Sequence, residues 1–387
     1  MNNRRARDAG IIIGEMTPGP NGAITDVEGV RVGHSTIMRG EGPLVVGEGP
    51  VRTGVTVVCP RGGSTREDPV FAGSHRLNGN GEMTGLEWIR ESGVLSTPVA
   101  ITNTHSVGVV RDALIAAELE ARTDEEEYWC LPVVAETFDG TLNDINGQHV
   151  GAEHVREALS RARGGPVEEG SVGGGTGMIC HEFKGGIGTA SRRLTEEEGG
   201  WTVGALVQAN YGRRAMLRVD GAPVGRVLTT GRVPSPYEAR ESSAGQGSII
   251  VVLATDALLL PHQCDRLAQR ATIGLGRMGG GCEDGSGDIF LAFATGNGGI
   301  PREGISELPA TIPLTMIPNE RMTPLFYAAA EATEEAILNA LLAAGTVTGR
   351  DGITAHGLTP DLLLGALDGA RALCARGVGE GMGARRT

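Results

Sequence analysis

One apolar run limits the folds open to this chain more than any other segment. Residues 249–255 read Ile-Ile-Val-Val-Leu-Ala-Thr, with no polar residue alternating between them. A run of this kind is typical of a strand that is buried on both faces. We therefore expect layers of sheet and helix rather than a sheet with one face in water.

The residue that opens this strand is a serine, Ser248, and a glycine, Gly247, precedes it. Glycine leaves the preceding peptide bond sterically open. The pair suits a reaction in which the serine hydroxyl attacks the carbonyl before it and the chain breaks. The freed α-amine of Ser248, with a pKa of roughly 7.7–8.0, would then serve as general base for its own hydroxyl. On this segment alone, an ordinary loop-to-strand junction with an incidental serine is the commoner case.

Three further strand candidates carry polar residues that suit the same chemistry. Ser286 and Asp288 are two residues apart, so on a strand they share a face and could polarise a neighbouring group. Asn210 ends a strand, where its amide could donate to an oxyanion. Glu136 follows an apolar strand and could receive a cationic group. Each also has an ordinary interpretation. Ser286 and Asp288 could form a turn at the start of a strand, Asn210 could cap a turn, and Glu136 could be a solvated charge.

Nine short segments spread over residues 10–300 carry a family resemblance. Together, by their sequences and their order, they resemble the DmpA-type self-processing aminopeptidases. This family comprises the L-aminopeptidase/D-esterase enzymes and the β-peptidyl aminopeptidases. The segments that carry the resemblance are 21–27, 29–34, 102–108, 135–137, 144–147, 173–178, 208–212, 247–250 and 286–288.

The resemblance implies autoproteolysis between Gly247 and Ser248. Residues 1–247 and 248–387 would then be the N-terminal (α) and C-terminal (β) chains of one globular catalytic domain. Ser248 would be the nucleophile and its α-amine the base.

The resemblance also assigns roles to the other polar residues. Ser286 and Asp288 would be essential supporting groups, although some members carry glutamate at the position of Asp288. Asn210 would be the oxyanion donor, and Glu136 the carboxylate near the free amine of the substrate. Phe138 would lie beside the substrate, and it leaves the preference for α- or β-amino acids open.

The implied function is hydrolysis of N-terminal aminoacyl amides, esters and short peptides through an acyl-enzyme, in a homotetramer of cleaved αβ units. An alternative is an acyltransferase related to ornithine acetyltransferase, in which threonine is the expected nucleophile. A non-enzymatic scaffold would keep an intact chain and no reactive serine. The sequence does not determine the natural substrate or the D or L preference.

A remote alternative is a dinucleotide-binding enzyme, because residues 274–279 match G-x-G-x-x-G. That motif needs a strand before it and a helix after it. Here a helical pattern precedes it and more glycine follows, which argues against nucleotide binding.

Composition excludes several partners. The formal net charge is −13, and no basic cluster with interleaved aromatic residues indicates nucleic acid. The six cysteines form no C-x-x-C pair and the eight histidines no ligand cluster, so we expect no metal and no cofactor. Scattered cysteines favour reduced thiols and a cytoplasmic location. No run approaches the roughly 18 apolar residues of a membrane helix.

Glycine is abundant, at 62 of 387 residues, and it indicates many tight turns between short strands. Strands and helices do not alternate regularly, so layers of largely antiparallel sheet covered by helices fit better than a doubly wound parallel sheet. The class is therefore α+β, and the resemblance sharpens it to an αββα sandwich of the N-terminal-nucleophile-hydrolase type. Expected strands are 54–59, 99–102, 131–135, 202–208, 248–255 and 288–294; expected helices are 81–91, 106–122, 154–162, 262–271, 325–344 and 361–375.

Overall fold

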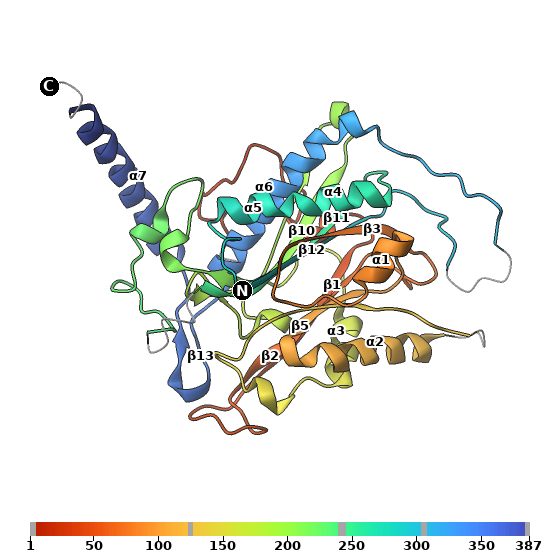
Figure 1. Ribbon diagram of the computed structural model, residues 1–387, viewed down its shortest axis with the longest axis horizontal. Coiled ribbons are helices and arrows are strands. Elements are labelled where there is room, and N and C mark those ends of the chain that lie inside the picture. The colour runs from red at the N-terminus through yellow and green to blue at the C-terminus, as the bar shows by residue number, and fades with distance from the viewer. Residues whose placement is uncertain (1–4, 123–126, 239–244, 303–307, 384–387) are drawn as a thin grey trace.

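The computed structural model describes residues 5–122, 127–238, 245–302 and 308–383, and two sheets form its centre (Figure 1). The six-stranded sheet has the order β4-β3-β12-β11-β10-β9, with β3 Val70–Gly79, β4 Val94–Leu95, β9 Gly186–Arg193, β10 Thr202–Gly212, β11 Gly245–Thr255 and β12 Ser286–Ala294. The four-stranded sheet has the order β1-β2-β5-β6, with β1 Arg31–Arg39, β2 Val51–Cys59, β5 Val99–Asn103 and β6 Val133–Thr137. Most neighbouring strands are antiparallel, but β11 runs parallel to β12 and β5 parallel to β6.

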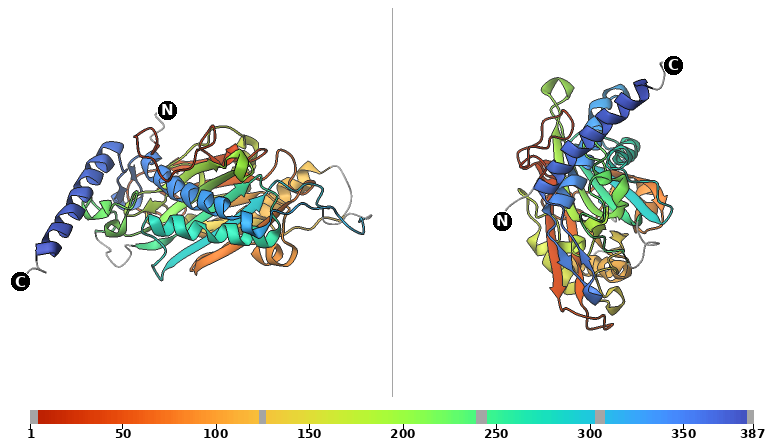
Figure 2. Two further views of the ribbon diagram at one scale, coloured as in Figure 1. Left: turned by 90° about the horizontal axis from the view of Figure 1, so that it is seen from above. Right: turned by 90° about the vertical axis from the view of Figure 1, so that its left-hand side faces the viewer.

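Helices cover the outer face of each sheet, so the layers read helix, sheet, sheet, helix (Figures 1 and 2). The helices on the six-stranded sheet are α4 Pro261–Gln269, α5 Ala271–Arg277 and α6 Thr323–Ala343. Those on the four-stranded sheet are α2 Val107–Ala121 and α3 Ala152–Arg161. This arrangement is the predicted αββα sandwich.

Strand β11 is buried on both faces, as its sequence predicts. Ile249 and Val251 pack into the core beneath the helices. Ile250 and Val252 pack into the core between the two sheets. The strand therefore lies in the middle of the sandwich, between β10 and β12 of its own sheet.

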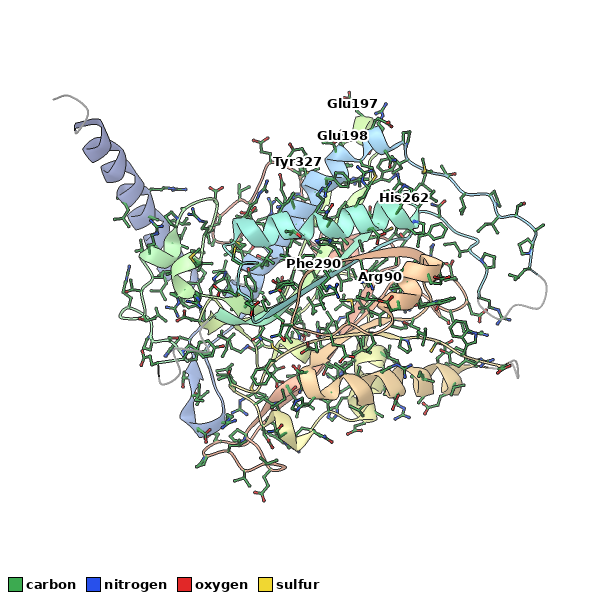
Figure 3. The ribbon with its side chains drawn as sticks, viewed as in Figure 1. Arg90, Glu197, Glu198, His262, Phe290 and Tyr327 are labelled. Atoms are coloured by element: carbon green, nitrogen blue, oxygen red, sulfur yellow. The ribbon has the colours of Figure 1, made fainter. Side chains whose placement is uncertain are left out.

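Figure 3 illustrates the same layering with two labelled side chains. Phe290 on β12 is fully buried beneath the helices, whereas Tyr327 on α6 is 59% exposed on the outer side of that helix. Aliphatic residues and alanine fill most of this core, since only 3% of the residues in the chain are aromatic.

Strands β1, β3 and β9 were not predicted from the sequence, because their polar residues conceal the strand pattern. In β9, Arg192 is fully buried, and its guanidinium pairs with Glu331 and Glu335 of α6 at 2.9 and 2.7 Å. A buried arginine is tolerated when carboxylates compensate its charge. Since those partners follow more than a hundred residues later, no local pattern announces the strand.

The remaining elements lie at the edges. They are α1 Leu86–Ser92, α7 Pro360–Gly383 and two short hairpins, β7 Ile179–Cys180 with β8 Phe183–Lys184 and β13 Val347–Thr348 with β14 Thr354–Ala355. Helix α7 projects from the body of the molecule (Figure 2). Within the described ranges, each helix is too short or too polar to cross a lipid bilayer.

The glycine motif at residues 274–279 does not form a nucleotide-binding turn. Gly274 and Gly276 lie within helix α5, directly after helix α4. A helix rather than a strand leads into the motif, and the N–H groups of Met278 and Gly279 donate to the carbonyls of Gly274 and Gly276. The dinucleotide-binding alternative therefore has no structural basis.

Candidate active site

A cavity of about 700 Å³ opens where the ends of the two sheets meet, and it gathers residues that are far apart in the sequence. Five of the predicted site residues line it: Glu136, Phe138, Asn210, Gly247 and Ser248. They come from β6, the segment after it, β10 and β11. The other two, Ser286 and Asp288, are in the adjacent strand β12 but do not line the cavity.

Ser248 lies at the wall of this cavity, and its side chain is fixed by the neighbouring strand. Its Oγ accepts a hydrogen bond from the backbone N–H of Gly287, with N and O 3.1 Å apart. The register places Ser248 between Gly287 of β12 and Asn210 of β10. The residue is 5% exposed, so its hydroxyl meets the cavity and little bulk solvent.

Only glycine fits before this serine. Gly247 has a φ of +144°, and a Cβ at this position would lie 2.0 Å from the carbonyl oxygen of Asn210. The same Cβ position is 3.3 Å from the Nδ2 atom of Asn210. The Cα of Gly247 therefore packs directly against the backbone carbonyl and the side-chain amide of Asn210.

Ser286 and Asp288 share a face of β12, as their spacing predicts, and the serine Oγ donates to Asp288 Oδ1 at 2.5 Å. Alternation along the paired strands places them on the side of the helices, because Phe290 faces that core. Ser248, in register with Gly287, faces the other side with Ile250. The pair is therefore positioned to act on the backbone of the Ser248 strand rather than to touch the hydroxyl.

Burial of the Asp288 carboxyl favours its protonated form. Burial raises the pKa of its carboxyl to about 6. The Ser286 hydroxyl and the backbone N–H of Ile249 act in the opposite direction, because they favour the ionised form. Its Oδ2 atom is buried and makes no hydrogen bond with a described residue. A cation placed beside this oxygen would lower the pKa again.

The amide of Asn210 has a defined orientation. Its Oδ1 accepts from the backbone N–H of Ile179 at 2.8 Å, and its Nδ2 donates to the carbonyl of Phe138 at 2.9 Å. One of these groups only donates and the other only accepts, so the amide cannot be flipped. The second Nδ2 hydrogen remains for an oxygen in the cavity.

Glu136 is 3% exposed, and two donors hold its carboxylate. One oxygen accepts from the backbone N–H of Glu82 at 3.0 Å, and the other from the hydroxyl of Thr104. Burial raises the pKa of Glu136, while these two hydrogen bonds act in the opposite direction. An ammonium group in the cavity would satisfy a carboxylate that is otherwise costly to keep ionised.

Sequence reasoning missed three side chains that shape this cavity or its carboxylate. Thr104 belongs to one of the recognised motifs, but nothing local linked it to Glu136. Tyr237 reaches the cavity wall from a loop and Arg350 from the turn between two short strands, and no periodic pattern places such residues.

Comparison with known proteins agrees with this geometry. Residues 22–355 match Peptidase family S58. The chain is 51% identical over 357 residues to "Beta-peptidyl aminopeptidase BapA" of Sphingosinicella microcystinivorans, covering 90% of this chain and 88% of that protein.

Two solved structures are similar over nearly their whole length. A "Burkholderia sp. beta-aminopeptidase" superposes with a TM-score of 0.88 at 60% identity, covering 95% of this chain and 99% of that chain. The "l-aminopeptidase d-ala-esterase/amidase" of Ochrobactrum anthropi, described as "a new variant among the ntn hydrolase fold", superposes at 0.86 with 43% identity, covering 94% and 98%.

These matches confirm the resemblance predicted from the short motifs, the predicted N-terminal-nucleophile-hydrolase fold, and the prediction of a peptidase. The match to the family spans most of the chain and includes every residue of the cavity wall named above. The chain therefore belongs to peptidase family S58.

Proposed function

We propose that this chain cuts itself between Gly247 and Ser248 and then acts as an N-terminal-serine aminopeptidase on short peptides, amides and esters. The observation that carries the proposal is the position of Ser248, which follows a glycine-only site and shares one cavity with Asn210 and Glu136. Two measurements test it together: the intact mass of the purified protein, expected as fragments 1–247 and 248–387, and release of p-nitroaniline from an aminoacyl p-nitroanilide.

Maturation would proceed in two balanced steps. The Ser248 hydroxyl attacks the carbonyl carbon of Gly247, the C–N bond breaks, and the departing nitrogen takes the proton. Water then hydrolyses the resulting ester and leaves a carboxylate on Gly247 and a free α-amine on Ser248. The unpartnered, buried Oδ2 of Asp288 is suited to receive the ammonium form of that amine.

Turnover would use the same serine. The α-amine takes the proton from Oγ as Oγ attacks the substrate carbonyl, and it returns the proton to the leaving amine. Water then releases the acyl group. The negative oxygen formed in each addition would accept the free Nδ2 hydrogen of Asn210.

Replacement of Asn210 by alanine tests the oxyanion role. We expect kcat to fall about 10²- to 10³-fold, the loss typical of one oxyanion donor, with a smaller change in KM. Thermal unfolding should be measured alongside, because Asn210 also joins Ile179 to Phe138. A change confined to KM would instead place Asn210 in substrate binding.

Selection of a free N-terminus would come from Glu136, since the Ser248 amine is already used as the base. We expect little or no hydrolysis of N-acetylated substrates, because the cap removes the positive charge and adds bulk. Glu136→Gln should raise KM for free-amine substrates roughly tenfold to a hundredfold, the effect of one charge-assisted hydrogen bond. The variant should also show a smaller difference in kcat/KM between free-amine and N-acetylated substrates.

The exposed Glu87 on α1 offers a matched control, because Glu87→Gln makes the same chemical change away from the cavity. Equal cleavage of capped and free substrates by the wild-type protein would contradict the aminopeptidase assignment.

The names of the relatives at 51% and 60% identity favour β-aminoacyl groups as substrates. We propose that class here, tested by comparing kcat/KM for β-alanyl and L-alanyl p-nitroanilides. Acyl transfer remains the second candidate, and serine rather than threonine at the nucleophile disfavours it. Loading by N-acetyl-ornithine, detected as an acetylated 248–387 fragment, would favour transfer. A cytoplasmic homotetramer of cleaved units belongs to the same proposal.

A further inference from the structure

The cavity carries charges of both signs. Glu82 and Glu136 supply carboxylates, and Arg350 is the single arginine or lysine among the described residues that line it. Glu136 lies in β6, whereas Arg350 comes from the hairpin of β13 and β14. The hairpin lies at the lower left of Figure 1 beside the end of β2, and Arg52 of β2 donates to its Thr348 carbonyl at 3.0 Å.

The backbone around Arg350 is well anchored. Its N–H donates to the carbonyl of Leu142 at 3.0 Å. The next residue, Asp351, donates its own N–H to the carbonyl of Gly42 and accepts from the N–H of Leu44, both at 2.9 Å. Arg350 therefore lines the cavity from an anchored stretch of backbone.

Only part of the Arg350 guanidinium is used within the protein. Its hydrogen bond to a described residue runs from Nε to Asp351 Oδ2 at 2.9 Å. The side chain is 20% exposed, and its Nη1 and Nη2 atoms make no hydrogen bond with any described residue. Two parallel N–H donors of an arginine match the two oxygens of a carboxylate.

We propose that Arg350 binds the C-terminal carboxylate of a dipeptide substrate. This inference rests on the proposed function, because it assigns the substrate end that leaves with the amine. The ammonium of the dipeptide would pair with Glu136 and its carboxylate with Arg350, with the scissile carbonyl at Ser248 between them. A cavity of about 700 Å³ is of the size that ordinarily holds a small-molecule ligand. The enzyme would then prefer free dipeptides to peptides whose C-terminus is blocked.

The test compares a dipeptide with its C-terminal carboxamide, both carrying the aminoacyl group that is cleaved best as a p-nitroanilide. For the wild-type protein we expect kcat/KM to be about tenfold to a hundredfold higher for the free carboxylate, as for a charge-assisted, bidentate contact. Arg350→Met should bring this ratio close to one. Arg350→Lys should give an intermediate ratio, because it keeps the charge but loses the planar pair of donors.

Arg161 on α3 provides the control, since it pairs with Glu157 on the surface and Arg161→Met removes the same charge outside the cavity. That variant should keep the wild-type ratio. A wild-type ratio near one, or an unchanged ratio in Arg350→Met, would overturn the inference. Hydrolysis of the p-nitroanilide by the wild-type protein tests the proposed function separately, because that substrate has no carboxylate. No hydrolysis of any free-amine substrate would overturn the proposed function and this inference together.

Discussion

Ser248→Ala is expected to leave one uncut chain and to lower kcat/KM by at least about 10⁴-fold, as removal of a covalent nucleophile does. Alanine has no hydroxyl to attack the Gly247 carbonyl, so neither maturation nor acyl-enzyme formation has a nucleophile. A denaturing gel with intact-mass analysis reads the first effect, and p-nitroanilide hydrolysis reads the second.

Ser160→Ala serves as the matched control, because Ser160 is an exposed serine of α3. It should mature and turn over like the wild type. A wild-type protein that stays uncut and still hydrolyses substrate would contradict the mechanism, since the base would then be absent.

Asp288→Asn and Ser286→Ala should each slow maturation, turnover or both by about 10²- to 10⁴-fold, the contribution of a positioned acid–base partner. Asparagine keeps the shape of Asp288 but cannot carry the negative charge that the new ammonium of Ser248 would meet. Ser286→Ala removes the donor that holds Asp288 Oδ1. Near-wild-type kinetics in both variants would show that Ser286 and Asp288 only form a turn at the start of the strand.

The raised pKa adds a pH dependence to the same prediction. In the uncut chain the pKa of Asp288 is about 6, so its ionised fraction falls as the pH drops below 6. Cleavage turns the Ser248 amide nitrogen into an amine that takes up a proton beside Asp288, so the ionised carboxylate favours this step. Self-cleavage of freshly synthesised protein should therefore slow by about tenfold per pH unit below this pKa. The time course of cleavage between pH 5 and 8 measures this effect, and Asp288→Asn should remove it.

Local patterns predicted the elements that bury apolar side chains without interruption. The strands predicted at 54–59, 99–102, 202–208, 248–255 and 288–294 fall within β2, β5, β10, β11 and β12. Strand β9 was not predicted, because the charge of its buried Arg192 is compensated by carboxylates of a helix more than a hundred residues later. Long-range compensation of that kind has no local periodicity.

Some residues of the candidate site follow from local sequence, and others depend on long-range packing. Ser248, Asn210 and Glu136 occupy strand positions, so sequence reasoning could propose them before any geometry was known. The opposite facing of Ser248 and Asp288 depends on strand register, which pairs Ser248 with Gly287. Arg350 depends on a hairpin that packs against β2 and the Leu142 carbonyl. Neither the register nor the docking of a distant hairpin follows from residue spacing.

The order of strands in the central sheet has a consequence for refolding. Strands β3, β4, β9 and β10 precede the proposed cut, whereas β12 and the part of β11 from Ser248 onward follow it. In the six-stranded sheet β12 lies between β3 and β11, and β11 pairs with β10. Neither fragment can complete this sheet alone, and the site can form only after the whole chain has folded once. If the chain is cut as proposed, unfolding of the mature protein releases two polypeptides. Refolding of each cleaved unit from denaturant would then be a bimolecular reaction whose yield depends on protein concentration. Each Ser248→Ala chain would instead fold in a unimolecular step, before any assembly of subunits.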